Sequence, residues 1–170
     1  ELIGGSGKVA VIVHDQTSLT GIQRRDGFLN RMAEAYPDIE VLEPQYGGGD
    51  HAASTDIANA FLTANPDLSG IFGANEGSAI GALTAVGEQE LEGKIIVIGF
   101  DAGVTQKDAI RSGVMSGAIT QDPVGIGYKA VEAAVKFING ETVEEMIDTG
   151  FHWYNADNMD DPVISPLLYD

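Results

Sequence analysis

Polar side chains stand at the ends of short apolar runs in this chain, and their types suit the binding of a hydroxylated small molecule. The five runs are residues 9–13, 39–42, 70–73, 95–100 and 117–120. The polar residues near their ends are His14, Asp15, Tyr46, Asp50, Asn75, Glu76, Asp101 and Gln121. Guanidinium, carboxylate and amide groups satisfy the hydroxyls of a neutral polyol in pairs, because each offers paired donors or acceptors in one plane. We therefore expect a sugar or polyol site built by Arg24, Asn75, Asp101 and Gln121, with Asp15, Tyr46, Asp50 and Glu76 as further candidates.

These residues have alternative roles. Asn75 and Asp101 precede expected helices, where short polar side chains commonly cap the first turn. Carboxylates and His14 at one edge of a sheet would also supply a general acid and base for an enzyme. Against catalysis, the chain contains no Gly-x-Ser-x-Gly nucleophile elbow and no cysteine. Its histidines are too scattered for a zinc site, so we expect a binding protein with no metal and no cofactor.

Amphipathic stretches separate the apolar runs and predict helices. The expected helices are residues 20–36, 50–64, 76–86, 105–111 and 123–138. Strands that alternate with helices indicate an α/β fold, a three-layer α/β/α lobe with a mostly parallel central sheet, and in such sheets ligands bind at the carboxyl ends of the strands. Residues 151–154 read as a short aromatic strand, and an acidic tail interrupted by prolines follows from residue 155 to residue 170.

Composition limits the possible partners. The chain of 170 residues has 9 basic and 26 acidic side chains, a net charge of −17. Such a surface repels phosphate backbones, so nucleic acid is not expected as a partner. No apolar run approaches the roughly 20 residues of a membrane-spanning helix. The start of the chain, Glu1-Leu2-Ile3 before Gly4-Gly5, is typical of the last turn of a helix, so we expect a further segment before it.

Several stretches, in order, resemble one family: the periplasmic sugar-binding proteins of ABC importers, of the ribose-binding type, whose lobes also occur in LacI-type regulators. The matching stretches are residues 21–28 (GIQRRDGF), 62–67 (LTANPD), 71–76 (IFGANE), 79–83 (AIGAL), 97–101 (VIGFD) and 118–123 (AITQDP). They cover nearly the whole chain up to about Gly140. The resemblance implies one lobe of a type I periplasmic-binding fold, in which the family's arginine, asparagine, aspartate and glutamine sugar ligands fall on Arg24, Asn75, Asp101 and Gln121.

One position departs from the family pattern. The aromatic residue that stacks on the sugar in ribose binders falls near Gly49, inside a run of three glycines, so the resemblance leaves the identity of the sugar open. Tyr46 is a candidate to supply a ring from another direction.

The resemblance also implies a division of the chain and its partners. Residues 1–121 and 151–170 correspond to the C-terminal lobe, and residues 122–150 to a crossover whose helix packs on an absent N-terminal lobe. We expect this helix to pair with another copy, to fold onto its own sheet, or to belong to a longer protein. The implied partners are a sugar or polyol and ABC permease subunits, and the implied location is the periplasm, or the cell exterior with a membrane tether in a Gram-positive source.

Two other functions remain open from the sequence. A LacI-type transcription regulator has the same lobes, and its DNA-binding head would lie before Glu1. A sugar-modifying enzyme is the less favoured alternative, because the sequence offers no obvious nucleophile.

Overall fold

The computed structural model describes residues 2–169, so Glu1 and Asp170 lie outside the described residues. Its strands are β1 (Gly7–Val13), β2 (Ile39–Val41), β3 (Gln45–Tyr46), β4 (Leu68–Gly73), β5 (Ile96–Phe100), β6 (Gly117–Gln121) and β7 (Phe151–Tyr154). Its helices are α1 (Leu19–Ala35), α2 (His51–Ala64), α3 (Glu76–Glu88), α4 (Val104–Arg111), α5 (Pro123–Ile138) and the short 3-10 helix η1 (Ser165–Leu167). Each of the predicted strands and helices is present. The two-residue strand β3 was not predicted.

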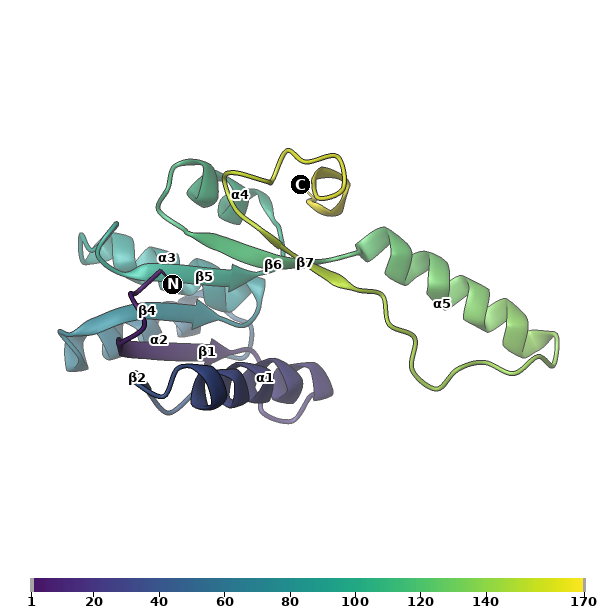
Figure 1. The fold of residues 1–170 in the computed structure, drawn as a ribbon, viewed down its shortest axis with the longest axis horizontal. Helices are drawn as coiled ribbons and strands as arrows, with labels where there is room; N and C mark the ends of the chain where they lie inside the picture. The colour runs from purple at the N-terminus through teal and green to yellow at the C-terminus, as the bar shows by residue number, and fades with distance from the viewer. Residues whose placement is uncertain (1, 170) are drawn as a thin grey trace.

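The strands form one sheet in the order β2-β1-β4-β5-β6-β7, with β3 also paired to β1 (Figure 1). Every pairing is parallel except that of β7, which runs antiparallel to β6. The predicted α/β lobe with a mostly parallel sheet is therefore confirmed. Because β1, β4, β5 and β6 point the same way, their carboxyl ends meet at one edge of the sheet.

The two faces of the sheet carry different helices. In β1 the side chains of Ala10 and Ile12 belong to a large core with α2, α3 and α4. Those of Val11 and Val13 point to the other face, where they form a smaller cluster with Phe28 of α1. This alternation follows from the two-residue period of a strand, and it produces the three layers.

Side-chain caps mark where four helices begin. Ser18, Asp50, Asn75 and Asp122 accept hydrogen bonds from backbone N–H groups in the first turns of α1, α2, α3 and α5. Each cap satisfies one of the N–H groups that a helix start leaves without a partner. In α5 the cap is followed by Pro123, which suits the first helical position.

Helix α5 projects away from the sheet (Figure 1). None of its residues is buried, and its apolar side chains are exposed, among them Val124, Tyr128, Val131, Val135, Phe137 and Ile138. One of the three arrangements expected for this helix, folding onto its own sheet, is therefore wrong. In residues 2–169, no helix is long and apolar enough to cross a membrane.

The C-terminal segment, residues 155–169, packs against the lobe near β6, β7 and α4 (Figure 1). Met159 and Ile164 are buried in the large core. The hydroxyl of Thr120 in β6 donates a hydrogen bond to the carbonyl oxygen of Leu167 at 3.2 Å. These contacts bring the end of the segment to the carboxyl edge of the sheet.

Candidate functional site

The carboxyl edge of the sheet brings three of the predicted site residues together. Asn75 follows β4, Asp101 follows β5, and Gln121 is the last residue of β6. The Gln121 amide nitrogen lies 3.5 Å from Asp101 Oδ1, and the backbone N–H of Glu76 donates to Asp101 Oδ2 over 3.3 Å. Both contacts are long, so the Asp101 carboxylate retains capacity to accept hydrogen bonds from a ligand.

Arg24 reaches the same edge from α1. Its guanidinium carbon lies 3.6 Å from the centre of the Phe100 ring, and its Nη1 donates a 2.9 Å hydrogen bond to the carbonyl oxygen of Ala74. Stacking on an aromatic face and a charged hydrogen bond hold the planar group in one orientation. Partial burial lowers the pKa of Arg24, while the Asp101 carboxylate opposes that shift. The guanidinium stays charged at neutral pH because its ordinary pKa is so high.

Asp101 has an unusual backbone. Its φ is +77°, in the left-handed region that residues with a side chain rarely occupy. Its N–H donates to the carbonyl oxygen of Ile119 at 2.7 Å, and its carbonyl oxygen accepts from the Tyr154 hydroxyl at 2.7 Å. A left-handed conformation costs about 1–2 kcal/mol. The surrounding hydrogen bonds hold Asp101 in this conformation, which aims its carboxylate at the edge.

Asn75 serves as the cap of α3, the alternative role that its position suggested. Its Oδ1 accepts from the N–H of Ser78 at 3.2 Å. Its amide nitrogen lies 3.5 Å from where a Cβ on Gly49 would be, so it faces the glycine run of residues 47–49. This nitrogen donates no hydrogen bond within residues 2–169, whereas an amide can do so twice. Capping therefore orients Asn75 without using up its donors.

The glycine run approaches α3 closely. A Cβ at Gly77 would overlap the carbonyl oxygen of Gly49. Gly48 and Gly49 both have positive φ, which glycine adopts without steric cost. The loop can thus lie against the first turn of α3 because Gly77 has no side chain, while Gly48 and Gly49 allow the backbone conformation of the loop.

Three further candidates are engaged elsewhere. Asp15 accepts from Thr17 and from the N–H of Ser18 in the turn before α1, which lowers its pKa to about 2. Asp50 caps α2 through the N–H of Ala53 at 2.8 Å. The hydroxyl of Tyr46 accepts a 2.9 Å hydrogen bond from Arg25. All three lie in loops or strands beside β1, and each already accepts a hydrogen bond within the chain.

Glu76 and His14 lie close to the central cluster. Glu76 Oε2 accepts a 3.3 Å hydrogen bond from the hydroxyl of Tyr169. Burial is the main cause that lowers the pKa of His14, and the Arg24 charge adds to it, so the imidazole is neutral at pH 7. The Nδ1 atom of His14 is buried and has no hydrogen-bond partner among the described residues. Such an atom is uncommon in folded proteins, where buried polar atoms are nearly always paired.

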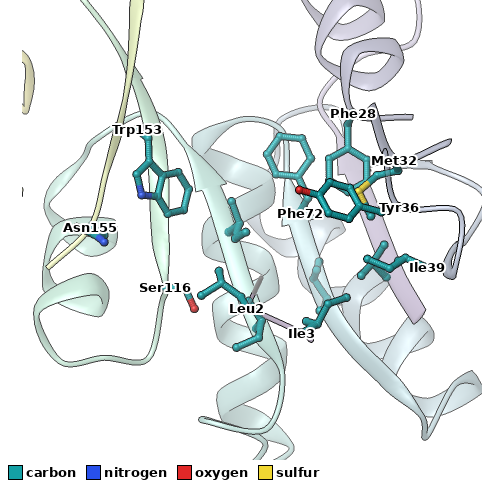
Figure 2. A pocket seen from close by; sticks show the side chains of 15 residues that line it. Leu2, Ile3, Phe28, Met32, Tyr36, Ile39, Phe72, Ser116, Trp153 and Asn155 are labelled. Atoms are coloured by element: carbon teal, nitrogen blue, oxygen red, sulfur yellow. The ribbon is translucent and has the colours of Figure 1, made fainter. Parts of the chain in front are cut away.

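An apolar groove of about 520 Å³ lies on the α1 side of the sheet, away from this cluster. Figure 2 shows Trp153 on one side of it and Phe28 and Tyr36 on the other, with Leu2 and Ile3 between them. None of Arg24, Asn75, Asp101 and Gln121 lines it. Its apolar lining does not suit a polyol, which needs polar partners for its hydroxyls.

Two residues of the site were missed in the sequence. Phe100 ends an apolar run, but its contact with Arg24 joins segments far apart in the chain, and no local pattern indicates it. Tyr169 lies in the C-terminal segment, beyond every periodic element. Its approach to Glu76 depends on how that segment folds back.

Comparison with known proteins identifies the relatives of the chain. A family model described as a periplasmic binding protein domain matches residues 1–142. The chain belongs to this family. The ribose import binding protein RbsB of Escherichia coli (strain K12) is 34% identical over 124 residues, which are 72% of this chain and 40% of that protein. The D-allose-binding periplasmic protein of the same strain is 28% identical over 129 residues, 76% of this chain and 41% of that protein.

Solved structures of similar proteins share the fold of nearly the whole chain. An ABC transporter solute-binding protein from Agrobacterium vitis, bound with α-D-tagatopyranose, has a TM-score of 0.93 and 37% sequence identity, covering 99% of this chain and 56% of that one. A carbohydrate transporter solute-binding protein from Agrobacterium radiobacter, in complex with D-arabinose, has a TM-score of 0.92 and 33% identity, covering 98% and 57%. The chain thus spans about half the length of these family members.

Proposed function

We propose that the chain is one lobe of the solute-binding component of an ABC importer, and that it binds a monosaccharide or polyol at the carboxyl edge of its sheet. The observation that carries this proposal is the group formed by Arg24, Asn75, Asp101 and Gln121, which come from four separate segments of the chain. Membership of the periplasmic binding protein family supports it. So do the sugars named for family members, which are the tagatose, arabinose, ribose and allose of the relatives above.

Each group has a distinct role in this proposal. Arg24 uses one N–H on Ala74 and directs its remaining donors at ligand hydroxyls. Asp101 accepts from two hydroxyls, since a carboxylate has about four lone-pair directions and its contacts within the chain are long. The amides of Asn75 and Gln121 both donate and accept. Hydrogen bonds to charged groups contribute about 1.5–3 kcal/mol each, so Arg24 and Asp101 supply most of the affinity.

Binding by this lobe alone is weak, and a second lobe completes the site. Residues 122–150 cross over to that lobe, and α5 packs on it through the exposed apolar side chains of Val131, Val135 and Ile138. In this proposal, residues 1–121 and 151–170 correspond to the C-terminal lobe of the complete protein. Ligand contacts from both lobes stabilise a closed state that the open protein samples, which is closure about a hinge.

Transport follows from this binding. The closed, loaded protein docks on permease subunits in the membrane and delivers the sugar. It does so from the periplasm, or from the cell exterior when tethered in a Gram-positive source. Binding and release of the sugar require this protein to make or break no covalent bond, so the proposed role is that of a binding protein and not of an enzyme.

Calorimetric titration of the full-length gene product with D-ribose, D-allose, D-arabinose, D-tagatose and inositol tests the proposal. We expect saturable binding of at least one of them. We expect Asp101→Asn to weaken it by on the order of tenfold or more, because a neutral amide replaces a charged acceptor. Asp56→Asn is the matched control on the exposed side of α2, and it should leave the affinity unchanged. If no sugar or polyol binds, or if both variants bind as the wild type does, the proposal is wrong.

A further inference from the structure

The peptide group between Asp101 and Ala102 lies between two tyrosine hydroxyls. Its carbonyl oxygen, on Asp101, accepts from Tyr154 at 2.7 Å. Its N–H, on Ala102, donates to the hydroxyl of Tyr169 at 3.3 Å. Both tyrosines come from the C-terminal part of the chain, one from β7 and one from the segment after it. This peptide follows the left-handed φ of Asp101, so the two contacts act where the backbone is strained.

Tyr169 also connects this turn to the first turn of α3. Its hydroxyl donates to Glu76 Oε2 at 3.3 Å while it accepts from Ala102. The N–H of Glu76 in turn donates to the Asp101 carboxylate. The hydroxyl therefore joins the residue after Asn75 to the residue after Asp101, and these are two of the proposed ligand residues.

Neither tyrosine is held loosely. Tyr154 is fully buried, and it pairs with Ala118 of β6 in the sheet. Tyr169 is 38% exposed, but Leu168 packs against the large core and Thr120 bonds to Leu167 just before it. Burial raises the pKa of Tyr169 to about 12, so its hydroxyl keeps its proton at physiological pH and remains a donor.

We infer that Tyr154 and Tyr169 are positioning residues of the ligand site: together they fix the peptide after Asp101, which keeps the Asp101 carboxylate aimed at the ligand. The C-terminal segment thereby becomes part of the binding machinery, since it carries Tyr169 to the edge of the sheet. This assignment rests on the proposed function, because it concerns how strongly a sugar is bound. It predicts an effect on the ligand hydroxyls that Asp101 contacts, not on binding in general.

The test uses the full-length gene product with Tyr169→Phe, which removes only the hydroxyl at a partly exposed position. The sugar that binds among D-ribose, D-allose, D-arabinose and D-tagatose is compared with its singly deoxygenated analogues by calorimetry. Asp101→Asn first identifies the sugar hydroxyls that the carboxylate contacts: they are those missing from the analogues whose binding this substitution weakens less than it weakens binding of the intact sugar. Tyr36→Phe is the matched control, because the Tyr36 hydroxyl makes no hydrogen bond among the described residues and lines the apolar groove.

We expect Tyr169→Phe to weaken binding of the intact sugar by about threefold to tenfold, the worth of one hydrogen bond. The same substitution should weaken binding of an analogue that lacks a hydroxyl contacted by Asp101 less than it weakens binding of the intact sugar. Tyr154→Phe should follow the same pattern. If burial makes that variant unstable, Tyr169→Phe decides the question without it.

Two results overturn the inference, and they are distinguishable from failure of the proposed function. Equal weakening of the intact sugar and of every analogue means that Tyr169 supports the fold only. Wild-type affinity in Tyr169→Phe, alongside weakened binding in Asp101→Asn, means that the hydroxyl does not position the carboxylate. If the wild type binds no sugar at all, the proposed function fails and this assignment fails with it.

Discussion

Substitutions at Asp101 should change the stability of the fold and the affinity for sugar by different mechanisms. The residue combines a left-handed backbone, with φ of +77°, and a carboxylate that we propose as a ligand group. Asp101→Gly and Asp101→Ala both delete the carboxylate. Only glycine adopts positive φ without a steric cost. Both variants therefore lose the carboxylate, but only the alanine variant keeps the backbone strain.

The structure supports an order of magnitude for each effect. The two carboxylate contacts within the chain are 3.3 and 3.5 Å long, so together they contribute about 1 kcal/mol. Glycine recovers about 1–2 kcal/mol of left-handed strain. We expect Asp101→Gly to change the free energy of unfolding by less than about 1 kcal/mol. We expect Asp101→Ala to be less stable than Asp101→Gly by about 1–2 kcal/mol, because alanine retains the strain.

Binding should fall alike in both variants. Two charge-assisted hydrogen bonds to sugar hydroxyls contribute about 3 kcal/mol or more, so their loss corresponds to roughly a hundredfold or greater decrease in affinity. Urea unfolding of the full-length gene product measures the first quantity, and calorimetric titration with its sugar measures the second. An alanine variant as stable as the glycine variant would refute the strain at Asp101. Retention of wild-type affinity by either variant would refute the ligand role.

Two further predictions concern the surroundings of the site. Gly77→Ala should destabilise the protein by about 2 kcal/mol, because its Cβ would overlap the carbonyl of Gly49. A Cβ at Gly87 in the same helix would have its nearest neighbouring atom at 3.5 Å, so Gly87→Ala should stabilise the protein by about 0.5–1 kcal/mol in urea unfolding. Equal effects of the two substitutions would show that the close approach at Gly77 is absent. The N–H groups of the following turn lower the pKa of Asp15 to about 2. The ionised carboxylate therefore stabilises the folded state above its unfolded pKa of 3.8, and this stability is lost as the pH falls through about 2. Asp15→Asn should therefore lose less stability than the wild type between pH 4 and pH 2, and parallel acid unfolding curves would contradict this.

The local sequence was a good guide to the strands and helices. The apolar runs became β1, β2, β4, β5 and β6, because each is bounded by polar or turn residues and is long enough to cross the sheet. The helix expected at residues 123–138 is α5 with the same bounds, since Asp122 caps it and Pro123 occupies its first turn. Strand β3 was missed because two residues carry no periodicity, and only its pairing with β1 makes it a strand.

The site was predictable where the topology alone brings residues together. Asn75, Asp101 and Gln121 follow neighbouring parallel strands, so their meeting at one edge follows from the order of the strands. Asp15 and Asp50 follow the same rule, yet the carboxylate of Asp15 accepts from N–H groups of the turn before α1, and that of Asp50 caps α2. Sequence position places a side chain at the edge, but it does not say whether a neighbouring N–H group binds it first.

Long-range contacts were the part that the sequence did not reveal. Phe100 beneath Arg24, and Tyr169 beside Glu76, each join segments that no periodic pattern relates. The left-handed conformation of Asp101 was equally hidden, because aspartate is common at ordinary turns and caps as well. Such features depend on the packing of the complete lobe.

The position of the sugar is the most direct test of the central claim. A crystal structure of the full-length gene product, with the monosaccharide that binds it, measures this position. The account predicts that the sugar lies at the carboxyl edge of the sheet, with its hydroxyls within about 3 Å of the Arg24 guanidinium and the Asp101 carboxylate, as hydrogen bonding requires. A sugar seated anywhere else, with these two side chains making no contact to it, would contradict the account.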